Sequence, residues 1–149
     1  MSKKFLFCFL LPIKLIAQEQ FKKKEIGLNF FRNPSIGVEY RHNHISLHTG
    51  YYITNFEKNT TWKFFKAGVS YWFLPVDKKD IPSSFYFQAA LLYGLNRDYK
   101  NTLTGGIEPG FRKMIGNNLN IRLGVAALFS KNKTIRINPT PGISYVIKL

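Results

Sequence analysis

The chain has 149 residues, of which 45% are hydrophobic and 20% are charged, and its formal net charge is +14. This length corresponds to one domain, and the apolar and aromatic content excludes an intrinsically disordered chain. No apolar run approaches the roughly 18 residues of a membrane-spanning helix, and the single cysteine, Cys8, excludes a disulfide framework and a cysteine-rich zinc site.

The N-terminal residues have the layout of a secretory signal peptide. Lys3 and Lys4 precede an apolar stretch, which ends just before a short polar segment. This order of basic, apolar and polar residues is typical of a cleaved targeting segment. We therefore expect residues 1–17 to be the signal peptide and residues 18–149 to form the mature domain.

From residue 24 onward, apolar and polar residues alternate with a period of two, and turn-forming residues interrupt the alternation at regular spacing. This pattern is typical of β-strands joined by short turns. It predicts eight strands, at about residues 25–31, 35–42, 45–54, 61–74, 84–96, 102–114, 118–130 and 135–149.

The two faces of these strands differ in polarity, because successive side chains of a strand point to opposite sides of the sheet. One face is apolar in every expected strand, whereas the other carries charged residues at mid-strand. Nine of the eleven glycines fall on the polar face, namely Gly27, Gly37, Gly50, Gly68, Gly94, Gly106, Gly110, Gly124 and Gly142.

The glycines indicate which face points inward. In a narrow closed barrel, glycine is expected beside long charged side chains, because the interior volume is small. On the water-exposed face of a soluble barrel, so many glycines would only weaken the strands. The sequence therefore predicts an all-β fold, an eight-stranded antiparallel up-and-down transmembrane β-barrel with a polar interior and an apolar outer surface.

The aromatic residues of the expected strands fall near the two ends of the barrel, as interfacial aromatic girdles do. The expected strand directions place two groups at opposite rims. The first is Phe30, Tyr51, Trp62, Tyr93 and Phe129, and the second is Tyr40, Tyr71, Phe73, Phe85, Phe87, Phe111 and Tyr145.

With these features the chain resembles the small eight-stranded outer-membrane barrels of the OmpX, PagP and OmpA-barrel type. The likeness is architectural and includes the alternating C-terminal segment 142–149, although the last residue, Leu149, stands where such proteins usually have an aromatic residue. The resemblance implies insertion into the bacterial outer membrane by the barrel-assembly machinery. It also implies membrane lipid and lipopolysaccharide as surroundings, and we expect a monomer.

Eight charged and polar side chains on the inward face are expected to form one ion-pair network that fills the interior. Eight strands leave room for side chains alone, so we expect a filled interior and no channel. The expected network consists of Glu39, Arg41, His48, Lys66, Glu108, Arg112, Arg122 and Lys148.

The high positive charge does not predict a nucleic-acid-binding protein, because the basic residues are dispersed along the chain. In an outer membrane, the basic side chains of the outer loops would contact the phosphates of lipopolysaccharide. The expected contacts are Lys58, Arg97, Lys100, Lys131 and Lys133.

Two small clusters invite a chemical interpretation. All three histidines, His42, His44 and His48, lie around the second expected turn, but no cysteine and few carboxylates accompany them, so we expect no metal site and no cofactor. Ser46, His48 and Glu39 share the inward face and have the residue types of a nucleophile, a base and an orienting acid. Charged interior residues normally satisfy one another, so we expect no catalysis.

The sequence thus favours a non-enzymatic outer-membrane barrel with a structural or surface-interaction role in the bacterial envelope. Two alternatives remain open. One is a lipid A-modifying barrel enzyme, either an acyl hydrolase or a transferase. The other is a secreted soluble β-barrel that binds a hydrophobic ligand.

Overall fold

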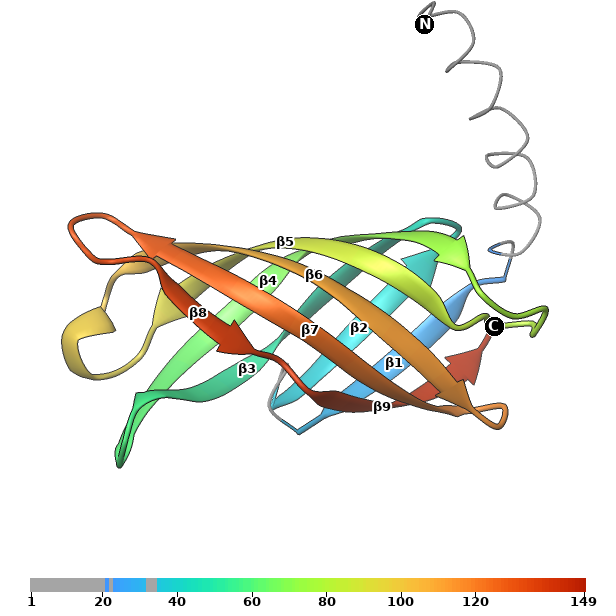
Figure 1. Ribbon diagram of the computed structural model, residues 1–149, viewed down its shortest axis with the longest axis horizontal. Coiled ribbons are helices and arrows are strands. Elements are labelled where there is room, and N and C mark those ends of the chain that lie inside the picture. The colour runs from blue at the N-terminus through green and yellow to red at the C-terminus, as the bar shows by residue number, and fades with distance from the viewer. Residues whose placement is uncertain (1–20, 22, 32–34) are drawn as a thin grey trace, which may run out of the picture.

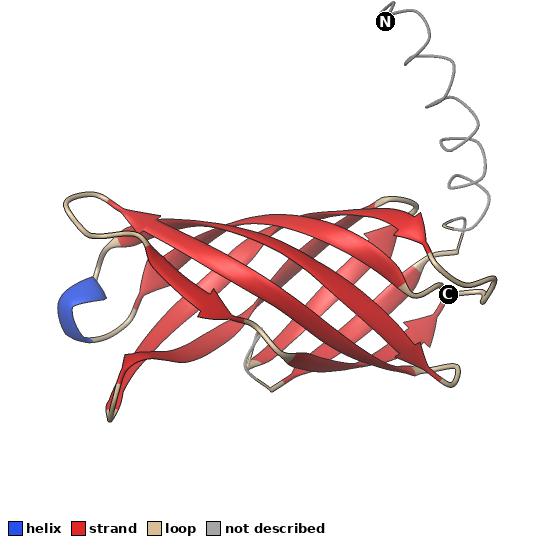
Figure 2. Ribbon diagram, in the orientation of Figure 1, coloured by secondary structure: helices blue, strands red, loops and turns tan. Residues whose placement is uncertain are grey.

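The computed structural model describes residues 21, 23–31 and 35–149. The expected signal peptide, residues 1–17, lies outside them. The described chain is almost entirely β-structure, with one short 3-10 helix, η1 (Arg97–Tyr99) (Figures 1 and 2). None of its helical segments is long and apolar enough to cross a bilayer.

The described residues form nine strands, and all of their pairings are antiparallel. The strands are β1 (Glu25–Phe30), β2 (Ile36–His42), β3 (Ile45–Glu57), β4 (Thr60–Pro75), β5 (Ser84–Gly94), β6 (Leu103–Ile115), β7 (Leu119–Ser130), β8 (Arg136–Pro139) and β9 (Gly142–Lys148).

The strands form a single sheet that closes on itself in a ring. Each strand from β1 to β7 pairs with the next along the chain. The last strand, β9, pairs with β1 on one side and with β7 on the other. The predicted all-β, antiparallel arrangement is therefore confirmed, and the sheet has a closed interior.

The prediction of one continuous strand over 135–149 is wrong, because this segment is divided into β8 and β9. Both pieces pair with β7, which they follow one after the other. Pro139 and Pro141 flank the interruption, and proline has no N–H to donate to a ladder. Between them, Thr140 keeps one backbone bond, from its N–H to the carbonyl of Gly124, at 2.8 Å.

The predicted faces are confirmed by the burial of the side chains. Along β7, for example, Leu119, Ile121 and Leu123 are exposed, whereas Asn120 and Arg122 are buried. The same alternation runs through the other strands. Large apolar side chains cover the outside of the ring, whereas polar side chains and a smaller set of aromatic and apolar ones fill its inside. This is the reverse of the usual burial pattern in water-soluble proteins.

The interior has two halves. The proximal half contains the β2–β3, β4–β5 and β6–β7 connections and the C-terminus, and it is mostly polar. The distal half contains the β3–β4, β5–β6 and β7–β8 connections, and it is mostly aromatic. The two sets of connections lie at opposite ends of the ring (Figure 1).

Candidate functional site

At the proximal end of the interior, Glu25 joins two buried arginines. Arg41 donates through Nη2 to one oxygen of the Glu25 carboxylate at 2.9 Å, and its Nε lies 2.9 Å from the other oxygen, within ion-pair distance. Arg112 donates to the same carboxylate and, at 3.2 Å, to the carbonyl of Pro82. Two guanidinium groups therefore share one carboxylate in a place where neither contacts water, since Arg41 and Arg112 are fully buried.

Phe21 packs inside the proximal part of this network, in a buried cluster with Trp72 and Tyr86. Its side chain is fully buried, and the Arg41 guanidinium lies 5.2 Å from the centre of its ring. The Phe21 ring also packs against the His44 ring, with 4.8 Å between the ring centres. A buried aromatic side chain therefore packs beside the proximal ion pairs.

Deeper inside, Glu39 pairs with Arg122 and accepts a hydrogen bond from Ser46. The Trp72 indole N–H donates to the Ser46 hydroxyl at 2.8 Å. Trp72 also packs against one cation of each group, with the Arg112 and Arg122 guanidinium carbons 4.3 and 5.0 Å from the centre of its ring. Such contacts stabilise buried guanidinium groups in addition to their ion pairs.

A third group of interior residues is centred on Glu108. Lys66 contacts Glu108 at 3.4 Å and donates to Gln88 at 2.7 Å, and the Tyr86 hydroxyl donates to Glu108 at 2.6 Å. These bonds connect three neighbouring strands, β4, β5 and β6, through their inward side chains. The network thus links strands that are already joined by backbone ladders.

Interior glycines make room for these large side chains. A Cβ at Gly110 would lie 2.4 Å from the Tyr86 ring, and a Cβ at Gly124 would lie 2.8 Å from both Glu108 and the Tyr86 hydroxyl. Glycine was predicted on the inward face because the interior is crowded. At these two positions the volume of the Tyr86 side chain is a specific cause.

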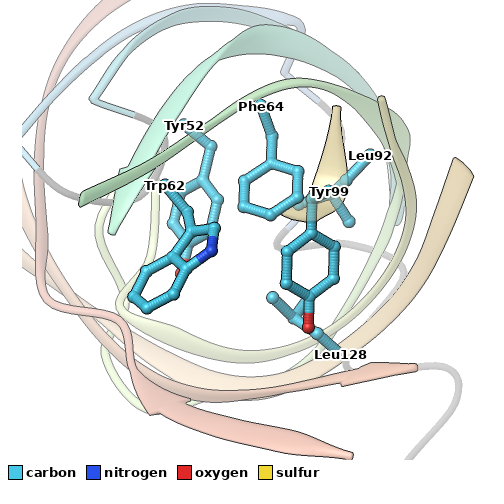
Figure 3. Close-up of a cluster of buried hydrophobic side chains, with 6 residues drawn as sticks. All are labelled: Tyr52, Trp62, Phe64, Leu92, Tyr99 and Leu128. Carbon is cyan, nitrogen blue, oxygen red and sulfur yellow. The ribbon is translucent and has the colours of Figure 1, made fainter. Parts of the chain in front are cut away.

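The distal half of the interior contains an aromatic cluster, formed by Tyr52, Trp62, Phe64, Leu92, Tyr99 and Leu128. Figure 3 shows these side chains inside the ring of strands. The placement of Trp62 in an outer aromatic girdle was wrong, because its side chain is 96% buried and points inward. Its position in the alternation of β4 explains this, since Phe65 and Ala67, an odd number of residues away, face outward.

The cluster is held closed at the distal end by Asp98. Its carboxylate accepts a hydrogen bond from the Trp62 indole at 2.6 Å and pairs with Lys133 at 3.2 Å. The bond from Trp62 is the main cause that holds the pKa of Asp98 below its usual value, and the Lys133 ammonium adds to it. The Lys133 ammonium also lies 4.6 Å from the centre of the Tyr99 ring, so this one cation contacts both Asp98 and Tyr99 at the distal end.

The wall of the ring is interrupted in the distal half. β8 pairs with β7 alone, and the end of β3 beyond Tyr51 pairs with β4 alone, among the strands of the described chain. Side chains join the two edges across the interruption. Asn138 donates to the Tyr52 and Thr54 hydroxyls at 2.8 and 2.5 Å, and Arg136 pairs with Glu57 at 3.1 Å.

The structure brings together Ser46, Glu39 and His48 but does not align them for catalysis. His48 lies opposite Glu39 in the β2–β3 ladder. Within the described residues, however, neither ring nitrogen of His48 has a hydrogen-bond partner. The Ser46 hydroxyl donates directly to Glu39, so the serine–histidine hydrogen bond that a triad requires is not formed.

The three histidines are separated. His48 is buried inside, His44 bonds through Nδ1 to the carbonyl of Trp72 at 2.7 Å, and His42 is exposed. No group of three or more potential metal ligands is found in the part of the chain that the structure describes.

The expected network residues other than Lys148 all lie buried inside the ring. Lys148 lies instead at the proximal end, where it and Lys23 pair with Asp80 at 3.4 and 2.8 Å. Hydrogen bonds from these two lysines hold the pKa of Asp80 below its usual value. The terminal position of Lys148 in β9 accounts for this, because the inward face there already opens to solvent.

The expected surface bases all lie at the distal end. Lys58, Arg97, Lys100 and Lys131 are exposed, and Lys133 is partly buried by its contacts with Asp98 and Tyr99.

Side chains nearly fill the interior. Between the polar network and the aromatic cluster lies a cavity of about 10 Å³, lined by residues that include Lys66, Ala90, Gly106 and Leu128. A volume of this size holds at most one water molecule. The arrangement of the interior is that of a filled structural core.

The sequence reasoning missed several residues of this core. Glu25, which pairs with two arginines, shares the inward parity of Gly27 and Asn29 and was identifiable by it. Trp72 and Tyr86 were identifiable in the same way. Comparison with known proteins adds no identification, because no family model, no curated protein and no solved structure matches the chain.

Proposed function

We propose that this chain is an outer-membrane β-barrel protein of the bacterial envelope, with a structural or surface-interaction role and no enzymatic activity. The observation that carries the proposal is the reversed polarity of the ring. Its inside holds buried ion pairs, and its outside carries apolar side chains along nearly every strand. Contiguous apolar surfaces of this extent are rare on soluble monomers, whereas a bilayer favours them.

Strand length and ring closure support the same proposal. β3 to β7 have 11 to 16 residues, which is enough for the roughly 9 to 11 residues that cross a bilayer obliquely. Where the ladders run continuously around the ring, in the proximal half, the sheet also satisfies its backbone groups without water, as the hydrocarbon layer demands.

The filled interior supports a role that does not involve transport or catalysis within the ring. Neither a solute nor an acyl chain fits into a cavity of about 10 Å³. The surface available for interaction is then the outer wall, in contact with lipid, and the distal connections, in contact with lipopolysaccharide and with partners outside the cell.

Fractionation tests location and fold together. The protein should remain with the outer membrane after extraction with salt or carbonate, and its gel mobility should change on boiling, because closed barrels often stay folded in cold detergent. Recovery as a soluble periplasmic or secreted monomer would contradict the proposal and favour the soluble-barrel alternative.

Cysteine labelling separates a lipid-facing wall from a water-facing one. Val69 is 44% exposed at the middle of β4, whereas Asn117 is exposed in the β6–β7 turn. In membranes, Val69→Cys should react with a lipid-soluble maleimide but not with a charged one, and the control Asn117→Cys should react with both. Equal reaction of Val69→Cys with the charged reagent would show that its face meets water.

A further inference from the structure

The basic residues of the distal end divide into two groups. Lys133 and Arg136 each pair with a carboxylate, of Asp98 and Glu57. The other exposed cations have no ion-pair partner among the described residues. They are Lys58, Lys63, Arg97, Lys100 and Lys131.

Two of the cations without an ion-pair partner in the described chain, Arg97 and Lys63, are positioned next to each other along β4. Arg97 donates through Nε to the carbonyl of Thr61 at 3.1 Å, which leaves its two terminal nitrogens directed elsewhere. Lys63 lies two residues along the same strand, a step of about 7 Å. Its backbone is fixed on both sides, by the Asn96 side chain at 2.8 Å and by the N–H of Leu95 at 2.8 Å.

The backbone of Arg97 contributes to this placement. Its φ of 54° lies in the left-handed region, which residues other than glycine and asparagine seldom adopt. The neighbouring Asn96 shares the Thr61 carbonyl with it, at 3.1 Å. The loop between β5 and β6 is therefore tied to β4 at the point where the arginine is presented.

An apolar wall adjoins this pair of cations on the proximal side. Lys63 shares the outward face of β4 with Phe65, and Phe65 lies opposite Tyr93 in the β4–β5 ladder. Phe65 and Tyr93 are about half exposed, and the Tyr93 hydroxyl donates to Asn101 in the distal loop at 3.0 Å. On the outer surface, the cations thus lie at the distal rim, and the aromatic and then the apolar side chains follow toward the middle of the ring.

We propose that Lys63 and Arg97 form a binding site for the phosphate headgroup of a membrane lipid, whose acyl chains lie along Phe65 and Tyr93. This inference rests on the proposed membrane location. Guanidinium and ammonium groups bind phosphate by charge-assisted hydrogen bonds, and aromatic residues are favoured at the same depth. The hairpin-tip cations Lys58 and Lys131 lie beyond the ends of their strands, so no strand fixes them on its outward face as β4 fixes Lys63.

The test measures lipid retention by native mass spectrometry of the folded protein, released from mixed micelles that contain phosphatidic acid and phosphatidylcholine. Phosphatidic acid supplies an exposed phosphate, and phosphatidylcholine has matched chains with a zwitterionic headgroup. We expect the wild-type chain to retain phosphatidic acid preferentially, and Lys63→Gln with Arg97→Gln to lower this preference roughly tenfold.

The matched control is Lys113→Gln. Lys113 is the other exposed lysine on the outward face of a strand, but it lies near the proximal end of β6. Its replacement removes one outward charge and should leave the preference unchanged. The single variant Lys63→Gln keeps the loop contacts of Arg97, so it reports on the site even if the double variant folds poorly.

Several results would overturn the inference. They are equal retention of the two lipids by the wild type, an equal loss in Lys113→Gln, or an unchanged preference in Lys63→Gln. Competition by inorganic phosphate at the lipid's own concentration would show a simple anion site without a lipid wall. All samples are first checked for the heat-dependent gel shift, which shows that the barrel is folded. If a sample shows the shift but does not retain phosphatidic acid, the result counts against this lipid site alone. Absence of the shift counts against the membrane barrel.

Discussion

The two halves of the ring are closed by different interactions. In the proximal half, β9 pairs with both β1 and β7, so backbone ladders run continuously around the wall. In the distal half, β1 and β2 do not extend far enough, and the edges of β3 and β8 are joined by side chains.

The interactions inside the two halves also differ. The proximal half relies on buried ion pairs, whose energy depends on complete pairing, and the distal half relies on apolar contacts that tolerate small shifts. The backbone ladders of the wall are therefore continuous where the interior is charged. Unpaired charges inside would be costly, so a continuous wall there has a physical reason.

The largest expected effect comes from removing the carboxylate that two buried arginines share. Glu25→Ala leaves Arg41 and Arg112 without their anion, and breaking a buried pair in this way typically costs about 3–5 kcal/mol. We expect a large drop in the unfolding midpoint in detergent. The distal control Glu57→Ala removes an exposed partner of Arg136 and should cost less than about 1 kcal/mol. Equal losses would remove the distinction between the halves.

A side chain at Gly124 tests the crowding between the two halves. Gly124→Ala would place its Cβ 2.8 Å from both Glu108 and the Tyr86 hydroxyl, and overpacking of this kind costs about 1–3 kcal/mol. At Gly27 the nearest atom to an added Cβ is 3.7 Å away, so Gly27→Ala should be tolerated. Denaturant unfolding of the two variants measures the difference, and a stable Gly124→Ala would show that this layer has room.

The interruption in the distal wall is tested through Asn138. Asn138→Ala removes both bonds to β3, and the expected loss is about 0.5–1.5 kcal/mol. Hydrogen exchange should rise at the end of β3 and at β8 but not in the proximal ladders. Asn118, which donates to the carbonyl of Val146 at 2.8 Å, provides the proximal control. If Asn118→Ala loosened the distal edges equally, the two halves would not be separate units.

The smallest expected effect is the pH dependence of the distal closure. The pKa of Asp98 is lowered in the folded protein, so its contribution is present above the unfolded-state pKa of about 3.9 and is lost as the pH falls through the folded value. Asp98 is largely exposed, and its replacement by Asn should cost less than about 1 kcal/mol at pH 7. Exchange of the loop that contains η1 should differ between wild type and Asp98→Asn at pH 7 and converge once the pH has fallen below the lowered pKa of Asp98. A difference that persisted at low pH would contradict this role.

The alternation of residues predicted the strands and their faces well, because a period of two has a direct geometric meaning in a sheet. It did not predict the end of the long strand at Thr140, where two prolines act together, or the inward position of Trp62. The alternation of residues in β4 places Trp62 on the inward face, but the expectation that large aromatic residues lie at the rims was given more weight. The partners within the network depend on the stagger between distant strands, as in the bond from Arg112 to Glu25, which no local pattern specifies.

The ladder between β1 and β9 has a consequence for the order in which the molecule can form. Ser144 and Asn29, which bond across it, are 115 residues apart in the chain. The ring cannot close before the last strand has been synthesised, and until then Arg41 and Arg112 have no enclosed carboxylate to meet. The earlier strands can add hairpin by hairpin, but the interior becomes dry only in the final step. A newly made chain therefore keeps an open interior until β9 is available, and the mutual repulsion of its excess positive charges opposes earlier compaction.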